Sequence, residues 1–183
     1  MKYRLLVSAM LVCSTFALSA CDSSSNSAAD VNSTKILDGK ATIVLPEGYK
    51  KMPEEMLVKK YTLEAQRPKE VWYVESEGGK VTMAFSMTAN PMKESQLAEF
   101  AGMMKKQFGS FSPEVSAVTV NGKKMQRLQM TTPDADDAEG GIYNLMQISS
   151  LDNKLLITTF NSTADLKDKY SAAGVEALSS LKY

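Results

Sequence analysis

The stretch that decides the fold is VSAVTVNGKKMQRLQMTT, residues 115–132. Two runs rich in β-branched and alternating apolar residues, Val115–Val120 and Lys124–Thr132, flank the dipeptide Asn121-Gly122. Asn-Gly readily adopts the two positive φ angles of a type I′ turn, whose twist matches that of antiparallel strands. The stretch therefore predicts a β-hairpin.

A second hairpin is predicted downstream, beyond an acidic loop over residues 133–141. Ile142–Leu151 and Lys154–Phe160 are apolar runs separated by the turn residues Asp152-Asn153. The second run is apolar enough for a strand in the centre of the sheet, covered on both faces.

A third hairpin is predicted upstream, where Val71–Glu75 and Val81–Thr88 flank a turn that contains Gly78-Gly79. Before it, Lys40–Leu45 alternates side chains with strand periodicity after a turn at Asp38-Gly39. These hairpins indicate an antiparallel sheet.

The sequence does not decide the secondary structure of residues 46–70, the segment between these strands. Pro53-Glu54-Glu55-Met56 fits the start of a short helix with proline at its first position. Tyr61–Leu63 fits a short strand.

Two longer helices are predicted around the two downstream hairpins. The first ends before Gly109, and its apolar face consists of Leu97, Phe100, Ala101, Met104 and Phe108. The second follows a capping arrangement of Ser162 and Asp165, and its apolar stripe consists of Leu166, Tyr170, Ala173, Ala177, Leu178 and Leu181. Strands broken by single helices, without regular βαβ alternation, indicate an α+β domain with an antiparallel sheet of about six strands flanked by helices.

The N-terminus predicts export and lipid attachment. Residues 1–20 combine Lys2 and Arg4 with an apolar run that is too short to span a bilayer, which is typical of a signal peptide. Leu18-Ser19-Ala20-Cys21 matches the lipobox of bacterial lipoproteins, so we expect cleavage before Cys21 and acylation of its thiol and new amine, for example with palmitate. Three acyl chains exceed the requirement for stable membrane anchoring. The alternative is an ordinary secreted protein in which Cys21 is incidental.

The residues after Cys21 predict where the folded domain stands. Asp22 resembles the signal that retains enterobacterial lipoproteins at the inner membrane, facing the periplasm; the alternative is that Asp22 only opens a polar linker. Residues 21–35 are polar and small, so we expect a lipidated N-terminus and flexible tether, followed by a single globular domain over 36–183.

Composition excludes several classes of function. Loss of Lys2 and Arg4 with the signal peptide leaves 19 basic and 21 acidic residues. The mature chain therefore has no excess of positive charge with which to bind nucleic acid. The chain has no histidine, so Ser-His-Asp and Cys-His catalysis are excluded. Its two cysteines are Cys13 in the signal peptide and the acylated Cys21, so we expect no disulfide in the mature chain.

Several clusters have both a functional and a structural interpretation. The first group is an acidic loop that contains Asp134, Asp136, Asp137 and Glu139. Its carboxylate oxygens are of the type that binds calcium, and the simpler interpretation is a solvated loop. A second group is formed by four methionines, Met83, Met87, Met103 and Met104. Their thioethers are of the type that binds cuprous copper, and the simpler interpretation is that they fill the core. The third group is Glu75 and Glu77, which would serve as an acid–base pair in an enzyme. The simpler interpretation is that both are solvated turn residues. We therefore expect no metal, no cofactor and no catalytic residue.

Trp72 and Tyr73 are adjacent in a predicted strand, so their rings point to opposite faces of the sheet. A solvent-facing aromatic ring is a candidate contact for a protein partner. The alternative is that helices cover both faces and both rings are buried.

Several short motifs make the chain similar to the DcrB family of bacterial inner-membrane lipoproteins. They are the lipobox with Asp22, Ile36-Leu37-Asp38-Gly39-Lys40, Leu45-Pro46, Gly122-Lys123-Lys124-Met125-Gln126 and Asn153-Lys154-Leu155-Leu156. The resemblance implies a PsbP-like fold and a role in envelope maintenance and phage susceptibility. It carries no catalytic motif.

We therefore expect a non-enzymatic, membrane-anchored periplasmic lipoprotein that binds membrane lipid through acylated Cys21 and an envelope protein through its domain. The alternatives are a small-ligand carrier with a groove between sheet and helices, and an unrecognised hydrolase.

Overall fold

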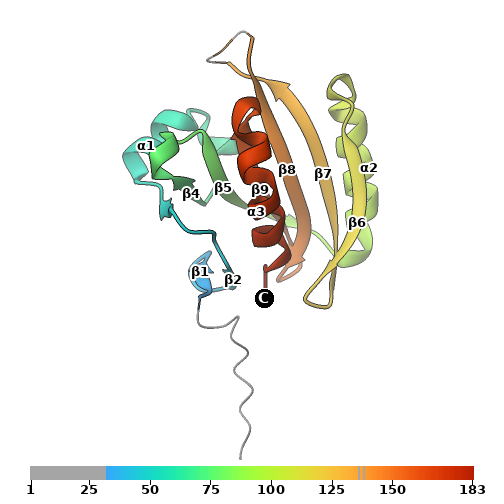
Figure 1. Ribbon diagram of the computed structural model, residues 1–183. Helices are drawn as coiled ribbons and strands as arrows, with labels where there is room; N and C mark the ends of the chain where they lie inside the picture. The colour runs from blue at the N-terminus through green and yellow to red at the C-terminus, as the bar shows by residue number, and fades with distance from the viewer. Residues whose placement is uncertain (1–31, 136, 138) are drawn as a thin grey trace, which may run out of the picture.

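The computed structural model of the chain describes residues 32–135, 137 and 139–183. Its centre is a seven-stranded antiparallel sheet with the order β3-β4-β5-β9-β8-β7-β6 (Figure 1). The strands are β3 (Tyr49–Lys51), β4 (Glu70–Val74), β5 (Val81–Pro91), β6 (Glu114–Val120), β7 (Lys123–Pro133), β8 (Gly141–Leu151) and β9 (Lys154–Thr163). The predicted α+β class is confirmed, and β9 takes the central place expected from its apolar sequence.

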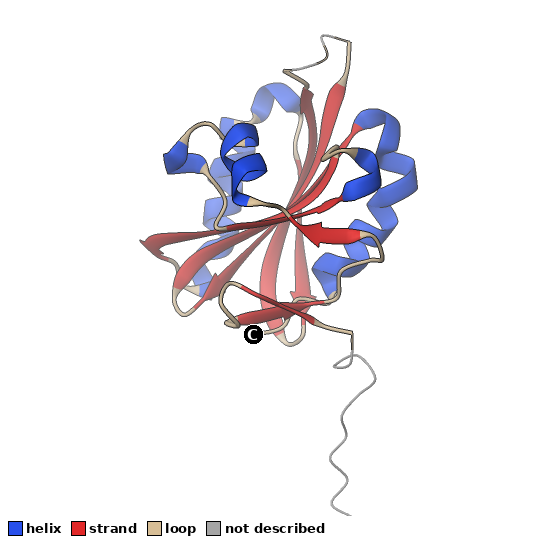
Figure 2. Ribbon diagram, turned by 90° about the vertical axis from the view of Figure 1, so that its left-hand side faces the viewer, coloured by secondary structure: helices blue, strands red, loops and turns tan. Residues whose placement is uncertain are grey.

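Three helices cover the sheet on both faces (Figure 2). They are α1 (Glu54–Lys60), α2 (Leu97–Gln107) and α3 (Lys167–Ser179). Leu178 of α3 packs in one core cluster with Leu145 of β8, whereas Leu97 of α2 packs in another with Ile148 of the same strand. Residues an odd number of positions apart in a strand face opposite ways, so α2 and α3 lie on opposite faces.

The predicted hairpin turns form because their residues accept a left-handed backbone. Asn121 and Gly122 have φ angles of 47° and 78°, as the type I′ turn requires. Asp152 and Asn153 have φ angles of 52° and 56°, and join β8 to β9 in the same way. Asn and Asp tolerate this region better than other non-glycine residues.

A separate two-stranded sheet, β1 (Thr34–Ile36) and β2 (Ala41–Ile43), precedes the main sheet. Thr42 and Lys182 exchange backbone hydrogen bonds of 2.8 and 2.9 Å, which fastens β2 to the C-terminal segment. Ile36, Ile43 and Leu181 are at most 1% exposed. The start of the domain is therefore part of its core.

The structure decides one segment that the sequence left open and corrects the predicted cap of the last helix. The short helix forms, but Tyr61 closes it by donating its N–H to the carbonyl of Leu57, so Tyr61–Leu63 is no strand. Ser162 does not cap the last helix, because it stays in β9 opposite Val81 and Tyr143. The main sheet also has seven strands instead of about six, since Tyr49–Lys51 adds an edge strand.

Candidate functional site

A cleft of about 1190 Å³ opens at one end of the main sheet. It lies between the end of α1, the turn from β4 to β5 and the loop from β7 to β8. This end of the sheet is opposite to β1, β2 and the C-terminus (Figure 1). The described part of the chain therefore begins at one end of the domain and forms this cleft at the other.

The floor of the cleft is a row of neutral polar side chains across three central strands. Thr82 of β5 lies opposite Asn161 of β9, which lies opposite Asn144 of β8. Asn161 Nδ2 donates to Asn144 Oδ1 at 2.6 Å, and Asn144 Nδ2 donates to the carbonyl of Ile142 at 2.8 Å. These two bonds fix the amides of Asn144 and Asn161 beside one another on the floor.

One wall of the cleft is cationic. Lys59 and Lys60 come from the last turn of α1, and Lys80 comes from the turn before β5. Lys60 Nζ donates to the carbonyl of Gly79 at 3.2 Å, which ties the end of the helix to that turn. Cations near a helix C-terminus are also favoured by the helix dipole, so this wall is a stable place for positive charge.

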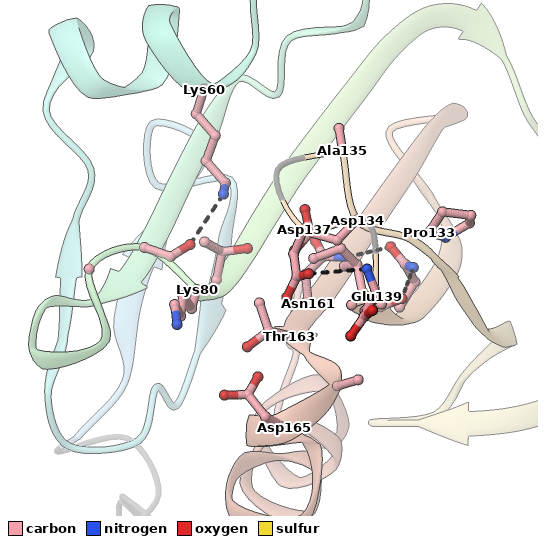
Figure 3. A pocket seen from close by; sticks show the side chains of 18 of the residues that line it. Lys60, Lys80, Pro133, Asp134, Ala135, Asp137, Glu139, Asn161, Thr163 and Asp165 are labelled. Atoms are coloured by element: carbon pink, nitrogen blue, oxygen red, sulfur yellow. Dashed lines mark hydrogen bonds between the residues drawn. The ribbon is translucent and has the colours of Figure 1, made fainter.

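The opposite wall is anionic and belongs to the loop between β7 and β8. Figure 3 shows Asp134, Asp137 and Glu139 across the cleft from Lys60 and Lys80. Asp137 Oδ1 accepts a hydrogen bond from the backbone N–H of Glu139 at 3.1 Å, which fixes one carboxylate of the loop.

Asp165 adds a fixed negative charge at the rim. The hydroxyl of Thr163 lowers the pKa of this carboxyl, helped by the charge of Lys80 and the backbone N–H groups of Asp165 and Leu166. Asp165 is therefore ionised at neutral pH. The cleft therefore has lysines on one side, with Asp165 close to Lys80, and the carboxylates of the loop from β7 to β8 on the other, above a neutral polar floor.

Tyr61 closes the cleft beside the cationic wall. Its ring packs against the buried cluster beneath α1, and burial raises the pKa of its phenol despite a hydrogen bond with Thr82. Tyr61 is therefore neutral at physiological pH.

The aromatic pair singled out in the sequence lies elsewhere. Trp72 and Tyr73 do point to opposite faces, but Tyr73 is only 7% exposed and packs beside Leu57 under α1. Trp72 is half-buried against the main core, and its Nε1 donates to Glu70. Tyr73 is thus no surface contact, and the only donor of the Trp72 side chain is used within the domain.

The methionines follow the core interpretation with one exception. Met83 is fully buried, Met104 is 8% exposed, and Met87 packs against the main core. Met103 is 55% exposed on α2, and no described contact accounts for it.

The carboxylates of Glu75 and Glu77 do not form a pair. Glu75 lies 2.5 Å from Lys50 Nζ, whereas Glu77 lies 2.8 Å from Lys169 Nζ and accepts a hydrogen bond from Tyr170 at 2.6 Å. The two side chains are thus engaged with different elements, β3 and α3.

Other predicted sites fall partly or wholly outside the described residues. Within the described part of the chain, no three His, Cys, Asp or Glu side chains are placed to share a metal ion. Asp136 of the acidic loop, the lipidation residue Cys21 and the retention residue Asp22 lie outside it. None of the described helices is long and apolar enough to span a membrane.

Sequence reasoning missed the amide row on the floor of the cleft. The available signal was the presence of Asn144 and Asn161 inside strands, away from the turns where asparagine is expected. Their proximity follows from the register of β8 and β9, which only the structure supplies.

The described fold is similar to solved structures of unrelated sequence. Cyanobacterial PsbP (CyanoP) from Synechocystis matches with a TM-score of 0.52 and 12% identity, over 82% of this chain and 90% of that one. The Ran-binding protein Mog1p of Saccharomyces cerevisiae matches at 0.47 and 9% identity, over 82% and 93%. LpqN of Mycobacterium tuberculosis, involved in cell envelope biogenesis, matches at 0.46 and 11%, over 78% and 82%.

The fold is PsbP-like. No family model matches the chain, and no curated protein matches its sequence. The likeness to CyanoP concerns the arrangement of the sheet and helices alone.

Proposed function

We propose that this protein is a non-enzymatic, lipid-anchored domain of the bacterial envelope, similar to the DcrB family, that binds another envelope component in the cleft. The observation that carries the proposal is the arrangement of the cleft, with Lys60 and Lys80 on one wall and Asp137 and Glu139 on the other. Opposed fixed charges select and orient a partner at an exposed site.

Anchoring is supported by the lipobox that ends at Cys21. Asp22 favours the inner membrane, with the domain in the periplasm and the short polar tether between them. Because Thr34 enters the domain at the end opposite to the cleft, an anchored domain presents the cleft away from its attachment (Figure 1). A role in envelope maintenance and phage susceptibility follows from the resemblance to the DcrB family.

The state of two carboxyl groups near this end of the domain, those of Glu77 and Asp165, favours binding over hydrolysis. An acid catalyst of the two-carboxylate type needs one carboxyl with a raised pKa. The ammonium of Lys169 and the phenol of Tyr170 instead lower the pKa of Glu77, and the pKa of Asp165 is lowered as well. Both groups are stabilised as anions.

The apolar carrier is disfavoured because side chains fill the space between the sheet and its helices. Ala177 and Leu178 of α3 pack with Phe160, and Ala101 of α2 packs with Leu128; each is at most 2% exposed. The cleft has a polar floor instead. Its chemistry suits a polar partner rather than an apolar ligand.

Photo-crosslinking in intact cells tests the binding site. A photoreactive amino acid at Lys80, on the rim, is expected to capture a specific envelope component. The matched control is Lys154, an exposed lysine at the other end of the sheet, at the start of β9. Capture of nothing at Lys80, or of the same species at both positions, contradicts the proposed site.

Fractionation tests the anchor. The wild-type chain is expected in the inner membrane with an N-terminal mass that includes the acyl chains, and Cys21→Ala is expected in the soluble fraction. An unmodified, soluble wild-type chain contradicts the proposal.

A further inference from the structure

We infer that the exposed edge strand β6 pairs with β6 of a second copy of this chain, antiparallel and about a two-fold axis at Ala117. β6 is the last strand of the main sheet and pairs with β7 alone. The inference goes beyond the proposed function, since none of the described residues that line the cleft belongs to β6.

The two edges of the main sheet differ in how they resist pairing with another chain. β3 at one edge has three residues, of which Lys50 and Lys51 are charged. β6 at the other edge has seven, keeps an uninterrupted register with β7, and is charged only at Glu114, its first residue. Proteins protect exposed edges with short strands, lysines, prolines or bulges. Within the described sheet, the β6 edge lacks this protection, and Ala117 and Thr119 are exposed there.

The backbone groups of β6 that point away from β7 belong to Val115, Ala117 and Thr119. In a two-residue hairpin the residues that flank the turn, here Val120 and Lys123, form a hydrogen-bonded pair. Hydrogen-bonding direction alternates along a strand, so every second residue before Val120 also points to β7. The N–H and C=O groups of the residues between them therefore point out of the sheet, along its edge.

These groups fix the register of a second copy. Pro113 has no N–H to donate, and Asn121 adopts the left-handed conformation of the turn, with a φ of 47°. The usable groups are thus centred on Ala117. Antiparallel self-pairing uses all of them only when Ala117 lies opposite Ala117, and Val115 opposite Thr119, of the second copy. The two-fold axis then lies beside the smallest side chain of the strand, and closed two-fold pairs are the commonest homo-oligomers.

Charges are complementary in this register. Glu114 lies opposite Val120 of the second copy, whose own neighbour across the hairpin is Lys123. Residues directly opposite one another share a face of the sheet, so Glu114 and that Lys123 lie on one face. Their backbones are about 10 Å apart, a gap that the two long side chains can span. The axis repeats this pair, and the two copies of Glu114 lie at opposite ends of the interface.

The helices leave room for the pair. α2 packs over β7, between β6 and β8. In the joined sheet β7 of one copy lies about 14 Å from β7 of the other, which exceeds the helix diameter of about 10–12 Å. The joined sheet ends in the short, lysine-bearing β3 on both sides, so assembly stops at two copies. Both N-termini lie at the same height along the axis, as two copies anchored in one membrane require.

Disulfide crosslinking tests the register. The mature chain with Cys21→Ser contains no cysteine, so an introduced thiol is its only one. Oxidation of Ala117→Cys is expected to give a covalent dimer, because hydrogen-bonded partners at the axis have Cα atoms about 5.5 Å apart, within disulfide range. Thr119→Cys, also exposed, is the control and is expected to stay monomeric, because its two copies lie about 14 Å apart. Mixed Val115→Cys and Thr119→Cys chains are expected to crosslink to one another but not to themselves.

Sedimentation without oxidant tests the edge itself. The unlipidated chain is expected to dimerise reversibly at the concentrations used for NMR. Ala117→Lys places like charges at the axis and is expected to weaken the dimer by about tenfold or more. Ala172→Lys, the same change at an exposed alanine of α3, is the control and is expected to leave the dimer unchanged. Thermal unfolding at the wild-type temperature in both variants shows that they remain folded.

Three results overturn the inference: equal crosslinking of Ala117→Cys and Thr119→Cys, an Ala117→Lys dimer as stable as the wild type, or a monomer at every concentration. Capture of a different protein by Ala117→Cys in intact cells also overturns it, because the edge then serves another chain. None of these outcomes touches the proposed function, since the cleft and the anchor are tested separately at Lys80 and Cys21.

Discussion

The indole Nε1 of Trp72 donates a hydrogen bond of 2.7 Å to Oε1 of Glu70, a carboxylate that is only 7% exposed. Glu70 Oε2 accepts the backbone N–H of Leu37 at 3.0 Å, and Lys51 Nζ lies 3.6 Å from Oε1. One buried carboxylate thus joins strand β4 to the turn between β1 and β2.

Removal of this carboxylate is expected to destabilise the domain. Glu70→Ala leaves the buried N–H of Leu37 and the part-buried indole N–H of Trp72 unsatisfied and should lower the free energy of unfolding by about 3 kcal/mol, whereas Trp72→Phe should cost about 1.5 kcal/mol. Urea denaturation checks both. Lys51→Ala is the control, expected to change stability by less than about 1 kcal/mol because its ammonium is exposed. Unchanged stability in Trp72→Phe would show that the indole hydrogen bond has no net effect.

A glycine in α3 permits the close approach of the helix to the sheet. A Cβ atom on Gly174 would lie 2.6 Å from Cγ of Phe160, whose ring is fully buried. Gly174→Ala is therefore expected to destabilise the domain by about 1–3 kcal/mol, although alanine favours helices.

The matched control for this prediction is Gly102→Ala in α2, where a Cβ atom meets nothing within 4 Å. Its expected effect is a gain of about 0.5–1 kcal/mol from helix propensity alone. Thermal unfolding of the two variants measures the contrast. Equal effects would refute the packing argument.

Acid is expected to weaken the link between Glu77 and α3. Hydrogen bonds from Lys169 and Tyr170 lower the pKa of Glu77 below its ordinary value of 4.5. The unfolded chain therefore takes up this proton more readily, and the stabilisation is lost as pH falls below about 4.5. Urea midpoints measured between about pH 5 and pH 3 should fall more steeply in the wild type than in Glu77→Gln.

The control for this pH dependence is Glu99→Gln, which changes an exposed carboxylate on α2. It is expected to retain the wild-type slope. A Glu77→Gln variant with the same slope as the wild type would refute the link.

The C-terminal segment is expected to stabilise the N-terminal hairpin. Deletion of Lys182 and Tyr183 removes both backbone hydrogen bonds to Thr42 and the partly buried ring of Tyr183, so it should cost about 2 kcal/mol or more. Hydrogen exchange should then be faster at β2. Lys182→Ala keeps the backbone bonds and removes only the side chain, so the difference between the two variants measures the backbone bonds alone; equal loss of protection in both variants would implicate the lysine side chain instead.

The elements that sequence predicted well are those whose determinants are local. Asn121-Gly122 specifies its turn because the required φ angles belong to those two residues. The apolar face from Leu97 to Phe108 specifies a helix in the same way. Residues 61–63 stayed undecided in the sequence because a run of three residues carries little periodicity.

The cleft could not be predicted from local sequence, because the residues that line it are brought together only by the tertiary structure. Pairing of β5 with β9 brings Thr82 to Asn161 across a large separation in sequence. A shift of one residue in that register would turn Asn161 to the other face of the sheet. The lysines of α1 and the loop from β7 to β8 approach one another for the same reason.

The bond between Thr42 and Lys182 has a consequence for biogenesis. The bridge that fastens the first hairpin to the domain cannot form until Lys182 has been synthesised, so this hairpin reaches its native packing only when the chain is nearly complete. Contacts of such long range slow folding, because the chain must close a large loop before they form. For the exported lipoprotein proposed above, this delay favours a state that can still be threaded across a membrane.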